Sequence, residues 1–359
     1  MAGHRLAAVV MLALACAGKG SAAESMRADD ARVTRMGRTV KDADGVLRFG
    51  YPGVTLGVNF TGSRLAVEMA GGAGSLVDVV VDGGAPLTLR PGLERRSLTL
   101  FEGAAGAHRV ELVHRTETWL GVVSVAGFAT DGAFKAAPAL PARTMLVLGD
   151  SVTCGADMER GSPDNPGDKN NPGDKNNPYW WNARVSYGML AARALQAQVQ
   201  LVCYGGRGLV RSWNGRTDEA QLPAFYEQAV ADAAHPVAWR QADYEPDLVL
   251  VAIGTNDFTA GIPERDNYVA AYAAFVRTLL KAHPHARIAL TEGAILNGEK
   301  KQVLREYLQE VAARVDSPRV QALPSEHHPG DALDAHPTTP QHAAMASELV
   351  PRLRKLMGW

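Results

Sequence analysis

The chain has 359 residues, of which 46% are hydrophobic, and its formal net charge is −1 at neutral pH. A chain with this net charge has no overall electrostatic attraction for a polyanion, so we expect neither nucleic acid nor an anionic membrane surface as a partner. The length exceeds that of a usual single domain and favours two. Only Cys154 and Cys203 follow the first 23 residues, too few for a disulfide scaffold, although an oxidising compartment would allow one bond between them.

Residues 1–23 are typical of an export signal. A short basic start that includes Arg5 precedes an apolar run, and small residues stand before Glu24 as they do at a cleavage site. The run is too short for a stop-transfer helix, and no later segment is apolar enough to span a membrane. We therefore predict a secreted or periplasmic protein, with a lipoprotein anchored at Cys16 as the alternative.

The first predicted domain, residues 24–137, alternates apolar and polar residues in short runs between glycine-rich turns. In the run "RLAVEMA", for example, Leu65, Val67 and Met69 share one face of a strand. No helix of useful length fits in this region. The pattern predicts an antiparallel β-sandwich or jelly roll.

The pattern of apolar residues changes in the second predicted domain, residues 138–359. This domain begins in a connector rich in proline and alanine. Apolar runs typical of buried strands alternate with segments of helical periodicity; the expected strands are 144–149, 199–205, 247–254, 286–293 and 320–325. This alternation predicts an α/β domain with a doubly wound, five-stranded parallel sheet, flavodoxin-like, and helices on both faces. Ligands bind such sheets at the carboxyl ends of the strands.

Residues 165–178 interrupt this pattern with the sequence "NPGDKNNPGDKNNP", a duplication of six residues. Its turn-forming pairs and lack of apolar residues predict an exposed, mobile loop. The aspartate and asparagine side chains do not have the spacing of a known calcium loop. His327 and His328 likewise lack the spacing of zinc ligands. We therefore expect no metal site.

Polar motifs stand where three of the predicted strands end. They are "GDS" at 149–151, "YGGRG" at 204–208 and "GTND" at 254–257, and His336 stands just before the last predicted helix. Taken singly, the serine could cap a helix, the asparagine could belong to a turn and the histidine could lie on the surface. Together, at one edge of a parallel sheet, they indicate a hydrolytic site.

The residue types suit acyl transfer through a serine. Ser151 would attack an ester carbonyl, and His336 would act as general base and then as general acid to the leaving alcohol. The oxyanion would be stabilised by the backbone N–H groups of Ser151 and Gly206 and by the side-chain amide of Asn256.

The four motifs, in this order, resemble those of the SGNH/GDSL hydrolase superfamily. That superfamily usually places an aspartate three residues before the histidine, but this chain has Leu333 there. The imidazole still needs an acceptor at Nδ1 to hold its tautomer. We expect Asp334 to be that acceptor, with Asp331 or a backbone carbonyl as alternatives.

A sandwich domain followed by this hydrolase domain resembles carbohydrate esterase family 2, whose members remove acetyl groups from xylan and related polysaccharides. The stretches "GDSVTCG", "YGGRGLVRSWNG" and "GTNDFT" carry the likeness. The resemblance implies deacetylation of an acetylated polysaccharide or oligosaccharide by a Ser-His(-Asp) mechanism without a cofactor. It suggests that Trp213 and Trp180 contact sugar, that Trp181 packs in the core and that a Cys154–Cys203 disulfide ties the first motif to the second strand.

Two alternatives remain. The first is another esterase of the same superfamily, acting on O-acetylated peptidoglycan or on short-chain esters; the polar loop after Ser151 argues against a lipid substrate. The second is a carbohydrate-binding protein without catalytic activity, against which the intact set of Ser151, Gly206, Asn256 and His336 argues. The sequence leaves the sugar, the hydroxyl position and the oligomeric state open.

Overall fold

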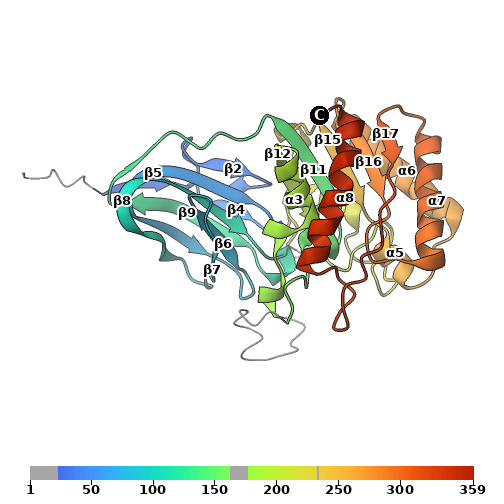
Figure 1. Ribbon diagram of the computed structural model, residues 1–359, viewed down its shortest axis with the longest axis horizontal. Helices are drawn as coiled ribbons and strands as arrows, with labels where there is room; N and C mark the ends of the chain where they lie inside the picture. The colour runs from blue at the N-terminus through green and yellow to red at the C-terminus, as the bar shows by residue number, and fades with distance from the viewer. Residues whose placement is uncertain (1–22, 162–176, 233) are drawn as a thin grey trace, which may run out of the picture.

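The computed structural model describes residues 23–161, 177–232 and 234–359. Nearly all of the predicted export signal and of the duplicated loop lies outside these residues. Figure 1 shows a β-rich N-terminal part beside an α/β C-terminal part. None of the helices in the described ranges combines the length and the apolar character that crossing a bilayer requires.

The N-terminal part is one antiparallel, ten-stranded hydrogen-bonded network. Its strands are β1 (Glu24–Arg27), β2 (Thr34–Met36), β3 (Val40–Lys41), β4 (Leu47–Phe49), β5 (Thr55–Ala70), β6 (Val77–Val81), β7 (Leu87–Leu89), β8 (Arg96–His114), β9 (Val123–Thr130) and β10 (Ala133–Phe134). The long strands β5 and β8 pair through register shifts, which bend a sheet and let it curl around its own core. Leu65, Val67 and Met69 are fully buried in that core, as their alternation in the sequence predicts.

The C-terminal sheet is parallel and five-stranded, in the order β12-β11-β15-β16-β17. Its strands are β11 (Arg143–Gly149), β12 (Ala197–Cys203), β15 (Leu248–Ala252), β16 (Arg287–Thr291) and β17 (Val320–Ala322). The second strand in the chain, β12, lies on one side of β11, and the later strands β15, β16 and β17 lie on the other. The direction of strand addition therefore reverses at β11, and a crevice forms there at the carboxyl ends of the strands. The predicted fold class is confirmed in both parts.

Helices cover both faces of this sheet (Figure 1). The helices of the C-terminal part are α1 (Ser151–Cys154), α3 (Tyr187–Ala194), α4 (Leu222–Tyr226), α5 (Thr255–Thr259), α6 (Arg265–Ala282), α7 (Gly298–Val315) and α8 (Thr339–Met357). This part also has the single turns η2 (Pro178–Trp180), η3 (Ala183–Val185) and η4 (Gln241–Asp243) and a hairpin of β13 (Gln228–Val230) and β14 (Val237–Ala238). The single turn η1 (Thr118–Leu120) belongs to the N-terminal part. Leu146 and Leu148 of β11 pack with residues of α6 and α7, whereas Met145 and Val147 pack with residues of α3 and α8. A strand apolar on both faces is therefore buried on both.

Buried polar contacts join the two parts. The guanidinium of Arg38, which follows β2, is 1% exposed and donates to the carbonyl oxygens of Tyr226 and Gln228 in the C-terminal part. The hydroxyl of Tyr51 donates to the carbonyl oxygen of Phe225 at 2.6 Å. Because such buried groups are costly when unpaired, these bonds fix how the two parts pack together.

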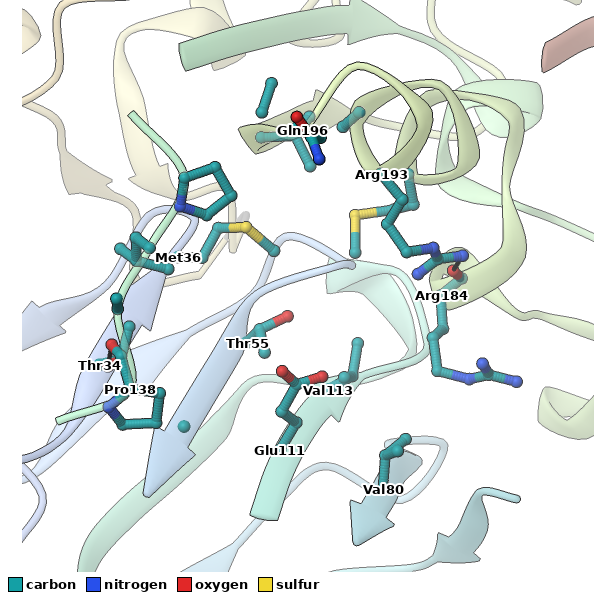
Figure 2. Close-up of a pocket in the computed structure, with 18 of the residues that line it drawn as sticks. Thr34, Met36, Thr55, Val80, Glu111, Val113, Pro138, Arg184, Arg193 and Gln196 are labelled. Atoms are coloured by element: carbon teal, nitrogen blue, oxygen red, sulfur yellow. Dashed lines mark hydrogen bonds between the residues drawn. The ribbon is translucent and has the colours of Figure 1, made fainter. Parts of the chain in front are cut away.

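A groove of about 940 Å³ also lies between the two parts, lined by Thr34, Thr55 and Glu111 on one side and by Arg184 and Arg193 on the other (Figure 2). Its lining includes the first residues of β11 and β12, so it opens near the amino ends of these strands. The motif residues follow the carboxyl ends, so this groove is separate from the candidate active site.

Candidate active site

The turn from β11 into α1 presents Ser151 at the switch point of the sheet. A Cβ on Gly149 would lie 2.0 Å from the Thr153 hydroxyl oxygen, so only glycine lets the chain turn this tightly. The carboxylate of Asp150 caps α1 by accepting from the Val152 N–H at 3.1 Å. The side chain that caps the helix is therefore the aspartate, and the hydroxyl of Ser151 is left for another partner.

That partner is His336. The hydroxyl oxygen of Ser151 lies 2.8 Å from Nε2 of His336, and Nδ1 of the same ring lies 2.5 Å from Oδ1 of Asp334. With its Nδ1 proton directed at the carboxylate, the imidazole offers its Nε2 lone pair to the serine. Of the three acceptors that the sequence left open for Nδ1, the structure places Asp334 in contact with the ring.

The local charges favour protonation of this imidazole. Burial alone would lower the pKa of His336, but the hydrogen bond with Asp334 and the negative charges of Asp157, Asp334 and Asp150 outweigh it and raise that pKa above its ordinary value. The bond with His336 in turn holds the pKa of Asp334 well below its usual range. The site is therefore built to stabilise an imidazolium.

Asp331 has a different place. Its Oδ1 accepts from Nε of Arg160 at 2.9 Å and from the Leu333 N–H at 2.8 Å. The side chain of Arg160 is fully buried, and it also donates to the carbonyl oxygens of Asp334 and His336, at 2.9 and 2.7 Å. Arg160 and Asp331 thus hold the loop that carries the histidine. No motif marks Arg160 in the sequence, because its contacts with this loop are more than 170 residues away.

Asp157 is a second carboxylate near the ring, with Oδ2 3.4 Å from Nδ1 of His336. Asp157, Asp334 and His336 bring potential metal ligands within 4.8 Å of one another. A cation at this point would compete with the Asp334 hydrogen bond for Nδ1, so the arrangement suits the imidazole better than a metal.

In the loop after β12, one backbone amide has no hydrogen-bond acceptor among the described residues. Every backbone N–H from 205 to 213 except that of Gly206 donates a hydrogen bond within the described part of the chain. Asp257 alone accepts from 209, 210 and 211, and the Gln221 side chain accepts from 208. Gly206 has φ +74°, a conformation that favours glycine. Its N–H has no acceptor among the described residues, and its role as an oxyanion donor stays a prediction.

Asn256 lies beside this amide. Its Nδ2 donates one of its two hydrogens to the carbonyl oxygen of Arg207 at 2.8 Å, which fixes the orientation of the side chain and leaves the second hydrogen available. Asn256 is 7% exposed. Ser151, Gly206 and Asn256 follow β11, β12 and β15, respectively. These strands are neighbours, and Gly149 at the end of β11 pairs with the last residues of the other two.

The tryptophans differ from one another in exposure. Trp213 is 58% exposed, and its Cδ1 would lie 3.0 Å from a Cβ on Gly206, so its indole stands beside residues 204–208, which we name the oxyanion loop for its predicted role. Trp180 is only 5% exposed and packs with Trp181 and Ala156. A ring buried in this way cannot stack on a sugar, so Trp180 is withdrawn as a substrate-binding residue; Trp181 packs in the core as expected.

Cys154 at the end of α1 and Cys203 at the end of β12 form a disulfide with their Cα atoms 5.7 Å apart. The bond ties the segment that carries the serine to the strand that leads into the oxyanion loop.

Comparisons with known proteins cover nearly all of the described chain. The model "Carbohydrate esterase 2 N-terminal" matches residues 35–139, and the model "GDSL-like Lipase/Acylhydrolase family" matches residues 147–344. An acetylxylan esterase / glucomannan deacetylase of Cellvibrio japonicus is 49% identical over 342 residues, which are 94% of this chain and 93% of the relative.

Solved structures are similar along the same length. A family two carbohydrate esterase from Cellvibrio japonicus matches with a TM-score of 0.90 and 49% identity, covering 94% of this chain and 99% of the other. A family two carbohydrate esterase from Clostridium thermocellum in complex with cellohexaose matches with a TM-score of 0.80 and 26% identity, covering 91% and 99%.

Proposed function

Because the chain belongs to carbohydrate esterase family 2, we propose that this carboxylic ester hydrolase removes O-acetyl groups from acetylated plant polysaccharides such as xylan and related hemicelluloses. One observation carries the proposal. The hydrogen-bonded series Ser151–His336–Asp334 is formed in a chain 49% identical to an acetylxylan esterase / glucomannan deacetylase. We further propose export through residues 1–23.

In the acylation step, Ser151 Oγ bonds to the acetyl carbonyl carbon while Nε2 of His336 takes the hydroxyl proton. Asp334 stabilises the imidazolium through Nδ1, and the N–H groups of Ser151, Gly206 and Asn256 hydrogen-bond to the oxyanion. As the tetrahedral intermediate collapses, the bond to the sugar oxygen breaks and that oxygen takes the proton from Nε2. Water then repeats the sequence on the acetyl-serine, releasing acetate and restoring the serine.

The surroundings of the site suit a sugar as the leaving alcohol. The exposed indole of Trp213 presents an apolar face beside the oxyanion loop, and aromatic faces pack well against pyranose rings. The mechanism requires no cofactor.

Asn256→Ala removes the side-chain donor to the oxyanion while leaving Gly206 in place. We expect kcat for p-nitrophenyl acetate to fall about 100- to 1000-fold with a small change in KM, since the lost interaction strengthens in the transition state. Steady-state kinetics measures this split. A loss of less than about threefold would mean that Asn256 only positions Arg207.

The substrate class is tested by acetate release from acetylated xylan, acetylated glucomannan and O-acetylated peptidoglycan, together with p-nitrophenyl esters of increasing acyl length. We expect release from the plant polysaccharides and a rate that falls as the acyl chain lengthens beyond acetyl. Release from peptidoglycan alone would favour the cell-wall alternative, and equal rates across acyl lengths would favour a general short-chain esterase. Binding of polysaccharide with no release from any substrate would favour a non-catalytic protein.

A further inference from the structure

Glu117 is a buried carboxylate that no sequence motif marks. It lies between β8 and η1, in the N-terminal part, and is 1% exposed. Its Oε2 accepts from the Gly205 N–H at 2.7 Å, so a residue from the N-terminal part holds the amide next to that of Gly206.

The same carboxylate holds two indoles. Oε2 also accepts from Nε1 of Trp119 at 3.0 Å, and Oε1 accepts from Nε1 of Trp181 at 3.2 Å. Burial outweighs the opposing effect of the N–H donors and raises the pKa of Glu117 to about 7. All of these partners donate, so the ionised carboxylate, with acceptor oxygens alone, is the form that satisfies them.

The identity of residue 205 fits this contact. A Cβ on Gly205 would lie 2.8 Å from Oε2 and 3.1 Å from Oε1 of Glu117. Gly205 does not have a positive φ, so its lack of a side chain is explained by the carboxylate rather than by its backbone conformation. The first glycine of the "GGRG" motif therefore makes room for a group from the other part of the chain.

Trp119 brings an aromatic face to the same place. It is 47% exposed, although its Nε1 is anchored on Glu117 and its ring meets Trp181 edge-on, with centroids 5.8 Å apart. The Trp119 Nε1 and the Gly205 N–H share one oxygen, so the exposed indole stands beside the oxyanion loop.

We propose that Glu117 is a positioning residue that fastens the oxyanion loop to the N-terminal part and fixes Trp119 as a sugar-stacking surface beside that loop. The Trp119 role rests on the proposed function. The N-terminal part thus completes the site, because it supplies both the anchor of the loop that carries Gly206 and an aromatic face for the polysaccharide.

The anchoring role is tested first with p-nitrophenyl acetate, which has no sugar. Glu117→Gln keeps the size of the side chain but points an NH₂ group at an N–H donor, so we expect kcat to fall about 10- to 100-fold with KM little changed. The concentration of active sites is titrated in each preparation. If kcat per active site equals that of the parent and only the unfolding midpoint falls, Glu117 has a structural role and the inference is wrong.

A double-mutant cycle tests the contact itself. Gly205→Ala places a methyl group against the Glu117 carboxylate and should lower kcat. In the Glu117→Ala background the same methyl group has room, so Gly205→Ala should lower kcat much less there. Additive effects of the two substitutions on kcat would contradict direct coupling between the loop and Glu117.

The stacking role of Trp119 is tested with Trp119→Ala. The matched control is Leu87→Ala, which replaces an exposed apolar residue on β7. Because loss of the ring removes the stacking contact with the sugar, we expect KM for acetylated xylan to rise about 10-fold, more than KM for p-nitrophenyl acetate. Trp119→Phe, which keeps a ring, should recover part of the loss. Equal changes in KM for acetylated xylan and p-nitrophenyl acetate would contradict the stacking role of Trp119. No release from any polysaccharide by the parent would instead overturn the proposed function, while kcat for p-nitrophenyl acetate would still test Glu117.

Discussion

Ser151→Ala is expected to lower kcat/KM for p-nitrophenyl acetate by about 10⁴-fold or more while the protein stays folded. The hydroxyl oxygen of Ser151 lies within hydrogen-bond distance of His336 Nε2, at 2.8 Å. Alanine removes the atom that forms the bond to the acetyl carbon but keeps the backbone N–H of residue 151. The oxyanion hole therefore survives, and only a small residual rate above that in water should remain.

The matched control is Ser347→Ala on the exposed side of α8, where the hydroxyl donates to the carbonyl oxygen of Ala343. Rates of the parent, the control and Ser151→Ala are compared after their unfolding midpoints are shown to agree. If Ser151→Ala is as active as the control, the nucleophile has been misassigned.

Asp334→Asn is expected to lower kcat by about 100- to 10,000-fold, because an amide can hold the ring in the wrong tautomer and cannot stabilise the imidazolium by charge. The pH dependence should change too. Asp334 helps to raise the pKa of His336, and the general base must be neutral, so activity rises with pH through that pKa. Without the carboxylate the pKa falls, and the acidic limb of kcat/KM should move to lower pH.

Asp331→Asn is the comparison that separates the two aspartates. Asp331 bonds to Arg160 and to backbone amides of its own loop, so its loss should cost less than about 10-fold and leave the acidic limb in place. Near-parental rates in both variants would mean that another group orients His336. Asp157, whose Oδ2 lies 3.4 Å from Nδ1, would then be the first residue to replace.

Much of the fold and part of the site could be predicted from local patterns. The β11 run is apolar on both faces because helices cover both, and the motif residues stand at strand ends because a parallel sheet gathers those ends at one edge. The sequence favoured Asp334 over Asp331 as the partner of His336 but left the alternatives open. The choice depends on how the loop before α8 folds back around Arg160, which sequence spacing does not encode.

Other features depend on contacts between distant parts of the chain. Trp180 and Trp213 look alike in the sequence, but tertiary packing buries the first and leaves the second 58% exposed. Glu117 lies 88 residues from Gly205, so neither its burial nor its role beside the oxyanion loop has a local signal. Gly205 does stand in a recognisable motif, "GGRG", but only the structure shows that this glycine makes room for a carboxylate.

The most direct test of the account is rapid-quench mass spectrometry of the protein mixed with acetylated xylan. The account predicts an acetyl group on the peptide that contains Ser151, formed before free acetate accumulates and absent from Ser151→Ala. Acetate release without any acetylated protein, or an acetyl group that forms at catalytic speed on another residue, would contradict it.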